Sequence, residues 1–185
     1  MGYSPELWAI ITLAAVVIVS AITDLRSGKI PNSVTYPAIA VGLIVQAYLH
    51  GSDGLVGALA GLAVGFLPML VFWLAGGIGG GDAKLMGAIG ALSNAKFAVS
   101  AMFCAFGVVL VMALVVMIRR RIVVATLRRI GRTLCLAVVP GVRAPSPSTE
   151  TSPRLPFGLA VCIGTGLALA DSLLSGPVAA RLLGI

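Results

Sequence analysis

Charged residues are scarce in this chain: Asp, Glu, Lys and Arg make up only 10% of its 185 residues, against about 25% in a typical soluble domain. Hydrophobic residues make up 59% before the 23 glycines are counted. A folded chain of this size cannot hide so much apolar surface from water. The composition therefore excludes a soluble globular domain, and it also excludes a disordered or a collagenous chain.

Cysteine and histidine are scarce as well. The three cysteines, Cys104, Cys135 and Cys162, are isolated and odd in number, which predicts small apolar filler in place of a CxxC metal site or a disulfide framework. The single histidine, His50, falls on the predicted outer side, across the membrane from Asp24 and Asp82, so neither a Ser-His pair nor a histidine-ligated zinc can be assembled around it there, and no HExxH is present. The glycine run over 76–82 lacks the Gly-Lys-Ser/Thr of a phosphate loop. We therefore expect neither a metal nor a cofactor.

Long hydrophobic runs are what the chain has in abundance. A helix that crosses the bilayer needs about 20 mostly apolar residues. Five segments approach that length, namely Leu7–Ile22, Ser33–Leu49, Leu55–Ala75, Phe97–Ile118 and Pro156–Leu174, and Ala83–Ala95 is a shorter sixth. The sequence therefore predicts an all-α fold, a polytopic transmembrane helical bundle of about six spans that forms a single domain over 1–185.

A repeat of small residues lies in the third of these segments. Gly57, Gly61 and Gly65 recur every four residues. Small residues at this spacing allow two helix backbones to approach closely in a membrane. The repeat predicts that this segment packs tightly on a neighbouring helix.

The basic residues predict the orientation of the spans. If Leu7–Ile22 runs from outside to inside, 11 of the 13 basic residues fall in inner segments, and only Lys96 and Arg181 fall outside. This asymmetry is typical of cytoplasmic loops and predicts a plasma (inner) membrane protein with both termini extracytoplasmic. The first basic residue, Arg26, follows the first apolar segment, so we expect that segment to remain as a helix and not to be a cleaved signal peptide.

The segment 119–153 differs in character from the rest of the chain. Arg119–Arg132 alternates arginines with aliphatic residues, which suits either a basic helix lying on the anionic inner leaflet or a stop-transfer cluster with a helical extension. Ala144–Pro153, rich in Pro, Ser and Thr, is expected to be a flexible loop. Nucleic acid is not an expected partner, because these arginines lie against the membrane without an aromatic platform.

Only six residues are acidic, and four of them, Glu6, Asp53, Glu150 and Asp171, are expected in loops or near headgroups. Asp24 and Asp82 differ, because both lie at the predicted inner ends of apolar helices, where a carboxylate is costly. Taken singly, each suits a helix end, with Asp82 as an N-cap. Taken together, two neighbouring carboxylates can hydrolyse an amide: one draws a proton from water and the other donates a proton to the carbonyl oxygen.

Three segments carry a family resemblance. Asp24 is followed by Ile30-Pro31-Asn32, the segment Gly79-Gly80-Gly81-Asp82-Ala83-Lys84 is a GxGD motif with the following lysine, and Pro156-Phe157-Gly158 opens the last predicted span. In this order they resemble the type IV prepilin peptidases, membrane aspartic proteases of the GxGD class. The resemblance implies that Asp24 and Asp82 are the catalytic pair of an endopeptidase that removes the short basic leader of prepilin-like proteins at the cytoplasmic membrane face.

The resemblance also suggests roles for the other motif residues. Gly79 and Gly81 would let backbone approach a substrate strand or adopt a positive φ, and Pro31 would set the turn into the second span. Lys84 and the segment Pro156–Gly158 would position substrate or shape the site.

The chain departs from larger members of that family. Those carry a cytoplasmic domain with paired CxxC motifs and also N-methylate the new amino terminus, whereas no CxxC is present here. The chain resembles the short form associated with tight-adherence (Flp) pili, which predicts a peptidase without methyltransferase activity. The alternatives are a GxGD protease with a non-pilin substrate, or a non-catalytic membrane scaffold or transporter. Pilus assembly partners and a second copy of the chain are further partners to consider.

Overall fold

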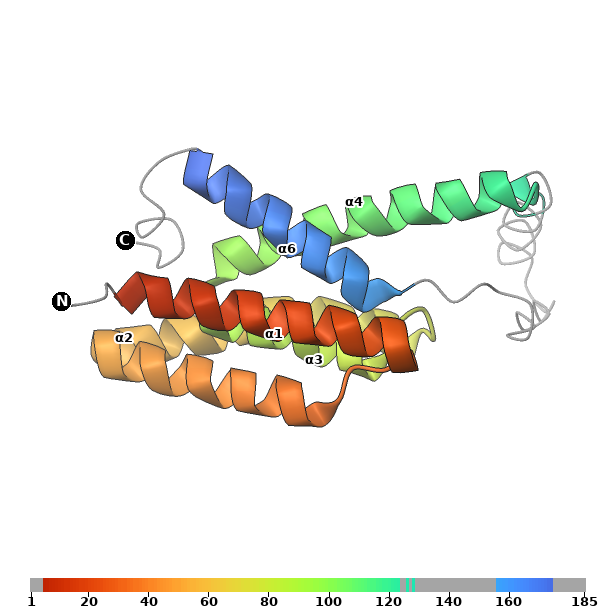
Figure 1. Cartoon of the computed structure of the whole chain (residues 1–185). Coiled ribbons are helices and arrows are strands. Elements are labelled where there is room, and N and C mark those ends of the chain that lie inside the picture. The colour runs from red at the N-terminus through yellow and green to blue at the C-terminus, as the bar shows by residue number, and fades with distance from the viewer. Residues whose placement is uncertain (1–4, 124–125, 127, 129–155, 175–185) are drawn as a thin grey trace. The chain divides into compact units, whose positions relative to one another are not determined.

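The structure is a computed structural model that describes residues 5–123, 126, 128 and 156–174, and these residues form helices without any strand. The helices are α1 (Pro5–Ser27), α2 (Asn32–Leu74), α3 (Gly80–Leu92), α4 (Ala95–Arg119) and α6 (Phe157–Leu174) (Figure 1). Among them α1, α2 and α4 are long and apolar enough to cross a membrane, and α6 is a shorter apolar helix. The predicted all-α membrane bundle is confirmed, while the number of spans and the side of the termini stay predictions.

The chain divides into two compact units, 1–108 with 156–185, and 109–155. The first unit holds α1, α2, α3, α6 and the first part of α4. In the second unit α4 ends at Arg119, and Arg121 has a positive φ of 54°. Half of the residues of the predicted interfacial helix over 119–132, and all residues of the predicted loop over 144–153, lie outside the described residues. The site described below belongs to the first unit.

Helix α2 is a helical hairpin that reverses direction at Gly51. Gly51 has φ 63° and ψ −142°, a conformation that favours glycine, and a Cβ placed at Gly54 would meet Gln46 O and lie 2.6 Å from His50 Cβ. The two halves therefore run back on one another, as Figure 1 shows. They correspond to the two separate apolar segments predicted over 33–49 and 55–75.

Helix α3 lies in the interior of the first unit. Of its residues 82–92, only Lys84 is not buried. A Cβ at Gly42 in the first half of α2 would lie 2.7 Å from the Ala91 carbonyl carbon, and Cβ atoms at Gly61 and Gly65 in the second half would meet the backbone of Gly90 and Met86. Both halves of α2 thus touch the backbone of α3, so a helix of only 13 residues is enclosed by its neighbours.

Only two of the three glycines in the predicted repeat pack against α3. Gly61 and Gly65 pack on α3 as expected, but a Cβ at Gly57 would meet nothing within 4 Å. The reason is that α3 ends at Leu92, about one turn before it could reach Gly57. The prediction of close packing is therefore confirmed for Gly61 and Gly65 and wrong for Gly57.

Helix α6 completes this unit by packing on α1. On another side of α6, a Cβ at Gly164 would meet the backbone of Ala105 in α4. Ala98, Ala101 and Ala105 are fully buried along the same part of α4. Small residues again permit the close approach, and they hold the beginning of α6 near the end of α1.

Candidate active site

Asp24 lies in the last turn of α1, one turn further along a helix than the apolar segment itself predicts. The helix ends at Ser27 because Gly28, with φ 63°, donates its N–H to the backbone oxygen of Asp24 at 2.7 Å. The Asp24 carboxylate accepts a second backbone bond, from Gly158 N–H to Oδ2 at 2.7 Å. Asp24 is half-buried, so its carboxylate is held by the beginning of α6 while remaining open to solvent.

Gly158 must be a glycine to make this contact. A Cβ at Gly158 would lie 2.9 Å from both Cβ and Oδ2 of Asp24, closer than side-chain carbons ever approach. The third predicted motif therefore reaches the first one through its backbone. Its glycine provides both the N–H donor and the space for the carboxylate.

Asp82 lies at the third position of α3, and Gly79 is the N-cap residue. The Asp82 side chain reaches back, and its Oδ2 accepts the Gly79 N–H at 3.1 Å. The alternative placement of Asp82 as the N-cap itself is therefore wrong, because the helix begins at Gly80, three residues earlier than the apolar segment predicts. With 8% of its surface exposed, Asp82 is a buried carboxyl group at the start of a buried helix.

Burial raises the pKa of Asp82 to about 6, because the ionised form loses hydration. The hydrogen bond from Gly79 opposes this shift, and the negative charge of Asp24 adds to it. Asp82 lies next to the buried residues 85–92, all of which are apolar or glycine. The two carboxyl groups thus influence one another electrostatically, and Asp82 gains and loses its proton near neutral pH.

Gly81 brings the second motif against the loop between α1 and α2. A Cβ at Gly81 would lie 3.0 Å from Cβ of Ile30, which is buried. The predicted positive φ is wrong for both Gly79, whose φ is −78°, and Gly81; the positive φ in this segment belongs to Gly76. The missing side chain of Gly81 lets Ile30 pack against the start of α3, so Gly81 has a packing role.

Lys84 joins the start of α3 to the start of α2. Its Nζ donates to Asn32 Oδ1 at 2.9 Å and lies 4.9 Å from the ring centroid of Tyr36. Pro31, with φ −73° and ψ 142°, is the N-cap residue of α2 and turns the chain into that helix. The lysine of the second motif and the asparagine of the first are therefore direct partners, and Tyr36 is a residue that the motifs did not indicate.

An aromatic cluster supports the beginning of α6. Phe106 packs edge-on against Phe72 with ring centroids 5.4 Å apart, and against Phe157 at 6.2 Å. Phe157 is next to Gly158 and was predicted from its motif. Phe72 and Phe106 come from α2 and α4, and no local sequence signal could have identified them, because their role depends on contacts between distant segments.

The remaining polar candidates lie elsewhere. His50 closes the first half of α2, at the far end from Asn32. Cys104 and Cys162 are free thiols, and Cys135 lies outside the described residues. No group of three or more His, Cys, Asp or Glu side chains that could hold a metal ion occurs in the described part of the chain.

The fold and the site define a membrane helical bundle in which two interacting carboxyl groups lie where the ends of α1, α3 and α6 meet. The family model described as the type IV leader peptidase family matches residues 11–117, so the chain belongs to that family. This match includes Asp24 and Asp82 but not Pro156–Gly158, which the structure joins to Asp24.

Among curated proteins, the chain is similar to the prepilin leader peptidase/N-methyltransferase of Bacillus subtilis (strain 168). The two are 33% identical over 105 residues, which is 55% of this chain and 42% of that protein. The match thus spans less than half the length of the relative. No solved structure matches the chain significantly.

Proposed function

We propose that this chain is a membrane aspartic endopeptidase that removes the short basic leader of a type IV prepilin-like protein. Asp24 and Asp82 are its catalytic residues. The observation that carries this proposal is that these two motif aspartates, from helices distant in sequence, lie at adjoining helix ends. Asp24 accepts the Gly158 N–H at the start of α6, and Gly81, next to Asp82, packs on Ile30 in the loop that follows α1. Membership of the leader peptidase family and the name of the Bacillus subtilis relative support the substrate class.

The different surroundings of the two carboxyl groups suggest different roles. Asp24 is half-buried and open to solvent, and its Oδ2 accepts the Gly158 N–H, so we assign it as the general base. Asp82 is buried and retains its proton to a higher pH, so it is the general acid. These roles describe the state of the pair that reacts.

The reaction then proceeds without a covalent intermediate. Water attacks the scissile carbonyl carbon while Asp24 takes its proton and Asp82 donates its own proton to the carbonyl oxygen. The tetrahedral intermediate loses the amine as the C–N bond breaks, the proton held by Asp24 passes to the leaving nitrogen, and the hydroxyl proton returns to Asp82. Atoms and protons balance, and the pair is restored for the next cycle.

The basic residues around the site support a cytoplasmic location in the inner membrane. Arg26 and Lys29 are exposed in the last turn of α1 and the loop that follows it, next to Asp24. Lysine and arginine near the end of a span are typical of its cytoplasmic side. The site would therefore face the compartment in which prepilin leaders lie.

The finer substrate assignment is a small Flp-type prepilin, cleaved without subsequent methylation. The absence of CxxC motifs from the sequence is consistent with this part of the proposal. Mass spectrometry of the mature pilin tests it, because N-methylation adds the mass of one methylene group. A methylated terminus produced by this chain alone would contradict it.

Co-expression with a prepilin that carries a basic leader tests the central claim. We expect the parent chain to shift the pilin to its shorter form on a gel, and both Asp24→Asn and Asp82→Asn to abolish the shift. Asp171→Asn is the matched control, because this exposed carboxylate lies near the opposite end of α6 from Gly158.

Every variant must reach the membrane at the level of the parent. Cleavage that survives both site substitutions would refute the assignment of the pair. A parent chain that leaves the prepilin intact but cleaves another membrane protein, still in dependence on both aspartates, would instead favour a GxGD protease with a different substrate.

A further inference from the structure

Trp73 lies beside the first turn of α3, the helix that carries Asp82. A Cβ placed at Gly80 would lie 3.2 Å from Nε1 and 3.4 Å from Cε2 of Trp73, so the nitrogen edge of the indole faces the first residue of α3. The Asp82 side chain folds back toward the same end of the helix, because its Oδ2 accepts the Gly79 N–H. Trp73 and the Asp82 carboxyl group therefore both lie at the beginning of α3.

Hydrogen bonds at the end of α2 hold the backbone of Trp73 in this place. Gly76, with φ 77°, donates its N–H to the Trp73 backbone oxygen at 2.9 Å, and Gly77 donates to the Phe72 oxygen at 2.9 Å. This pair of bonds is a common way in which a glycine ends a helix. The backbone under the indole is thus fixed, while Trp73 itself is 46% exposed.

Trp73 stands at one end of a row of aromatic residues. Its neighbour in sequence, Phe72, packs edge-on against Phe106, and Phe106 packs edge-on against Phe157. Phe157 adjoins the residue that donates its N–H to Asp24. The row therefore extends from the start of α3 to the residue that holds Asp24, so a peptide placed between the two aspartates would lie beside it.

Between Trp73 and Asp82 the chain exposes backbone more than side chains. Residues 75–77 and Gly79 are exposed, and each of them is alanine or glycine. A Cβ placed at Gly76 would meet nothing within 4 Å, so the surface beside it is open. An extended peptide can approach such a backbone closely, and the indole N–H of Trp73 is a hydrogen-bond donor at the edge of this surface.

We propose that Trp73 binds the substrate of the peptidase: its indole N–H donates to a backbone carbonyl of the extended prepilin segment, and its ring packs on the adjoining peptide group. This inference rests on the proposed function. Tryptophan is also common where helices leave the membrane, and an interfacial anchor is the competing role. An anchor needs its N–H only to reach water or headgroups, whereas the N–H edge of Trp73 faces Gly80.

Substitution of Trp73 separates these two roles. Trp73→Phe keeps an aromatic ring but removes the N–H, and we expect the KM for prepilin cleavage in detergent to rise about fivefold, the effect of one neutral hydrogen bond. Trp73→Ala also removes the ring and should raise KM about tenfold or more. In Trp73→Phe kcat should change by less than about twofold, because the contact is made equally before and during the reaction. An interfacial anchor predicts an unchanged KM.

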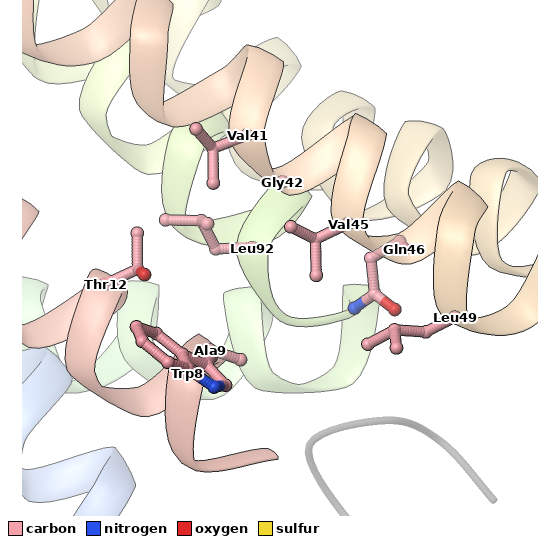
Figure 2. A pocket seen from close by; sticks show the side chains of 9 residues that line it. All are labelled: Trp8, Ala9, Thr12, Val41, Gly42, Val45, Gln46, Leu49 and Leu92. Carbon is pink, nitrogen blue, oxygen red and sulfur yellow. The ribbon is translucent and has the colours of Figure 1, made fainter. Parts of the chain in front are cut away.

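Trp8 is the matched control, because the chain has two tryptophans and both are exposed. From Trp8 to Asp24 helix α1 rises about 24 Å at 1.5 Å per residue. Figure 2 shows Trp8 at a pocket that Gln46 also lines, and Gln46 lines a polar cavity together with His50 and Asp53. Trp8 therefore belongs to the opposite end of the bundle, and Trp8→Phe should leave KM and kcat unchanged.

The emission of Trp73 gives a readout that does not depend on cleavage. In the full chain with Trp8→Phe and Asp82→Asn, purified in detergent, Trp73 is the single tryptophan. A prepilin peptide that lacks tryptophan and spans the cleavage site should shift this emission to shorter wavelength in a saturable manner. In the chain with Trp73→Phe and Asp82→Asn, the same peptide should leave the emission of Trp8 unchanged.

Two results would overturn the role of Trp73 in substrate binding. One is a KM in Trp73→Ala equal to that of the parent chain, and the other is a Trp73 emission that does not respond to a peptide that the parent chain cleaves. The proposed function fails in a different way, when cleavage survives both Asp24→Asn and Asp82→Asn. A parent chain that cuts no prepilin would refute both.

Discussion

Asp82 and Asp24 are both aspartates at helix ends, but their carboxyl groups differ in burial. Asp82 is enclosed at the start of a buried helix, and Asp24 is half open at the end of another. Each accepts one backbone N–H, from Gly79 and Gly158 respectively. The difference between them is hydration, which is why burial is the largest cause of the raised pKa of Asp82.

The pKa of Asp82 predicts a pH limit on cleavage. In the proposed mechanism Asp82 is the acid, and its pKa is about 6, so the reactive protonated form should decline as the pH rises above that value. We expect kcat/KM to fall about tenfold per pH unit on the alkaline side, measured with purified enzyme and a prepilin peptide at fixed ionic strength. A profile that stays level from pH 6 to pH 9 would contradict the role of Asp82 as the acid.

Gly158 provides a second test at the residue scale. Gly158→Ala places a methyl group 2.9 Å from Cβ and Oδ2 of Asp24, so either the carboxylate or the beginning of α6 must move. We expect cleavage to drop at least tenfold, because an error of about 1 Å in a catalytic group is this costly. Gly166→Ala on the same helix, where a Cβ meets nothing within 4 Å, is the matched control and should retain activity. Equal activity of the two variants would argue against the contact.

At the scale of elements, α3 depends on glycines of its neighbours. Gly61 allows the second half of α2 to touch the backbone of Gly90, whereas Gly57, one turn earlier in the same helix, faces open space. A helix of 13 residues is too short to be stable alone, so its position is determined by these contacts. Gly61 is therefore needed for the close contact with α3, whereas Gly57 is not.

Substitution of each glycine by alanine tests this distinction. We expect Gly61→Ala to lower the midpoint of thermal unfolding in detergent by several degrees, because the two backbones must separate. Gly57→Ala should leave the midpoint unchanged or raise it slightly, since alanine favours the helix more than glycine does. If both variants unfold at the same temperature, the close contact between α2 and α3 does not contribute to stability.

Lys84 and Asn32 connect α2 and α3 on the side of the site. Because they form one hydrogen bond, Lys84→Met and Asn32→Ala should each reduce cleavage severalfold, and the double variant should be little worse than either single one. The kinetic constants of all four chains give the coupling free energy, which we expect at about 1 kcal/mol. Fully additive losses would mean that the two residues act independently.

At the scale of the whole molecule, the proposed orientation puts the end of the bundle with Asp24 on the cytoplasmic side and the Gly51 turn on the outer side. Ser27 and Ser52 are exposed near the two ends of the α1–α2 region, the first beside Asp24 and the second in the Gly51 turn. In a chain whose native cysteines are replaced by alanine, Ser52→Cys should react with an impermeant maleimide on intact spheroplasts. Ser27→Cys should react only after permeabilisation. Labelling of Ser27→Cys, but not of Ser52→Cys, on intact spheroplasts would mean that the topology is the reverse of the proposed one.

The sequence predicted most of the helices but few of their boundaries. Hydropathy identified the apolar segments correctly, yet α1 continues through Asp24 to Ser27 and α3 begins at Gly80, before Asp82. Both ends are polar or glycine-rich, so composition alone places them outside the helix. Their helical state depends on Gly28 and Gly79, which complete the terminal hydrogen bonds of these helices.

Hydropathy and short motifs are local properties, so the residues alone were enough to predict a helical membrane protein and to select Asp24 and Asp82 as the candidate catalytic pair. Tertiary structure alone decided that Gly158 holds Asp24 across 134 positions of chain, that α3 is enclosed and that burial raises the pKa of Asp82. It also decided that Gln46, His50 and Asp53 line one cavity. These features arise from contacts between segments that are distant in the chain. Such contacts cannot be inferred from the residues next to each position, whereas hydropathy can.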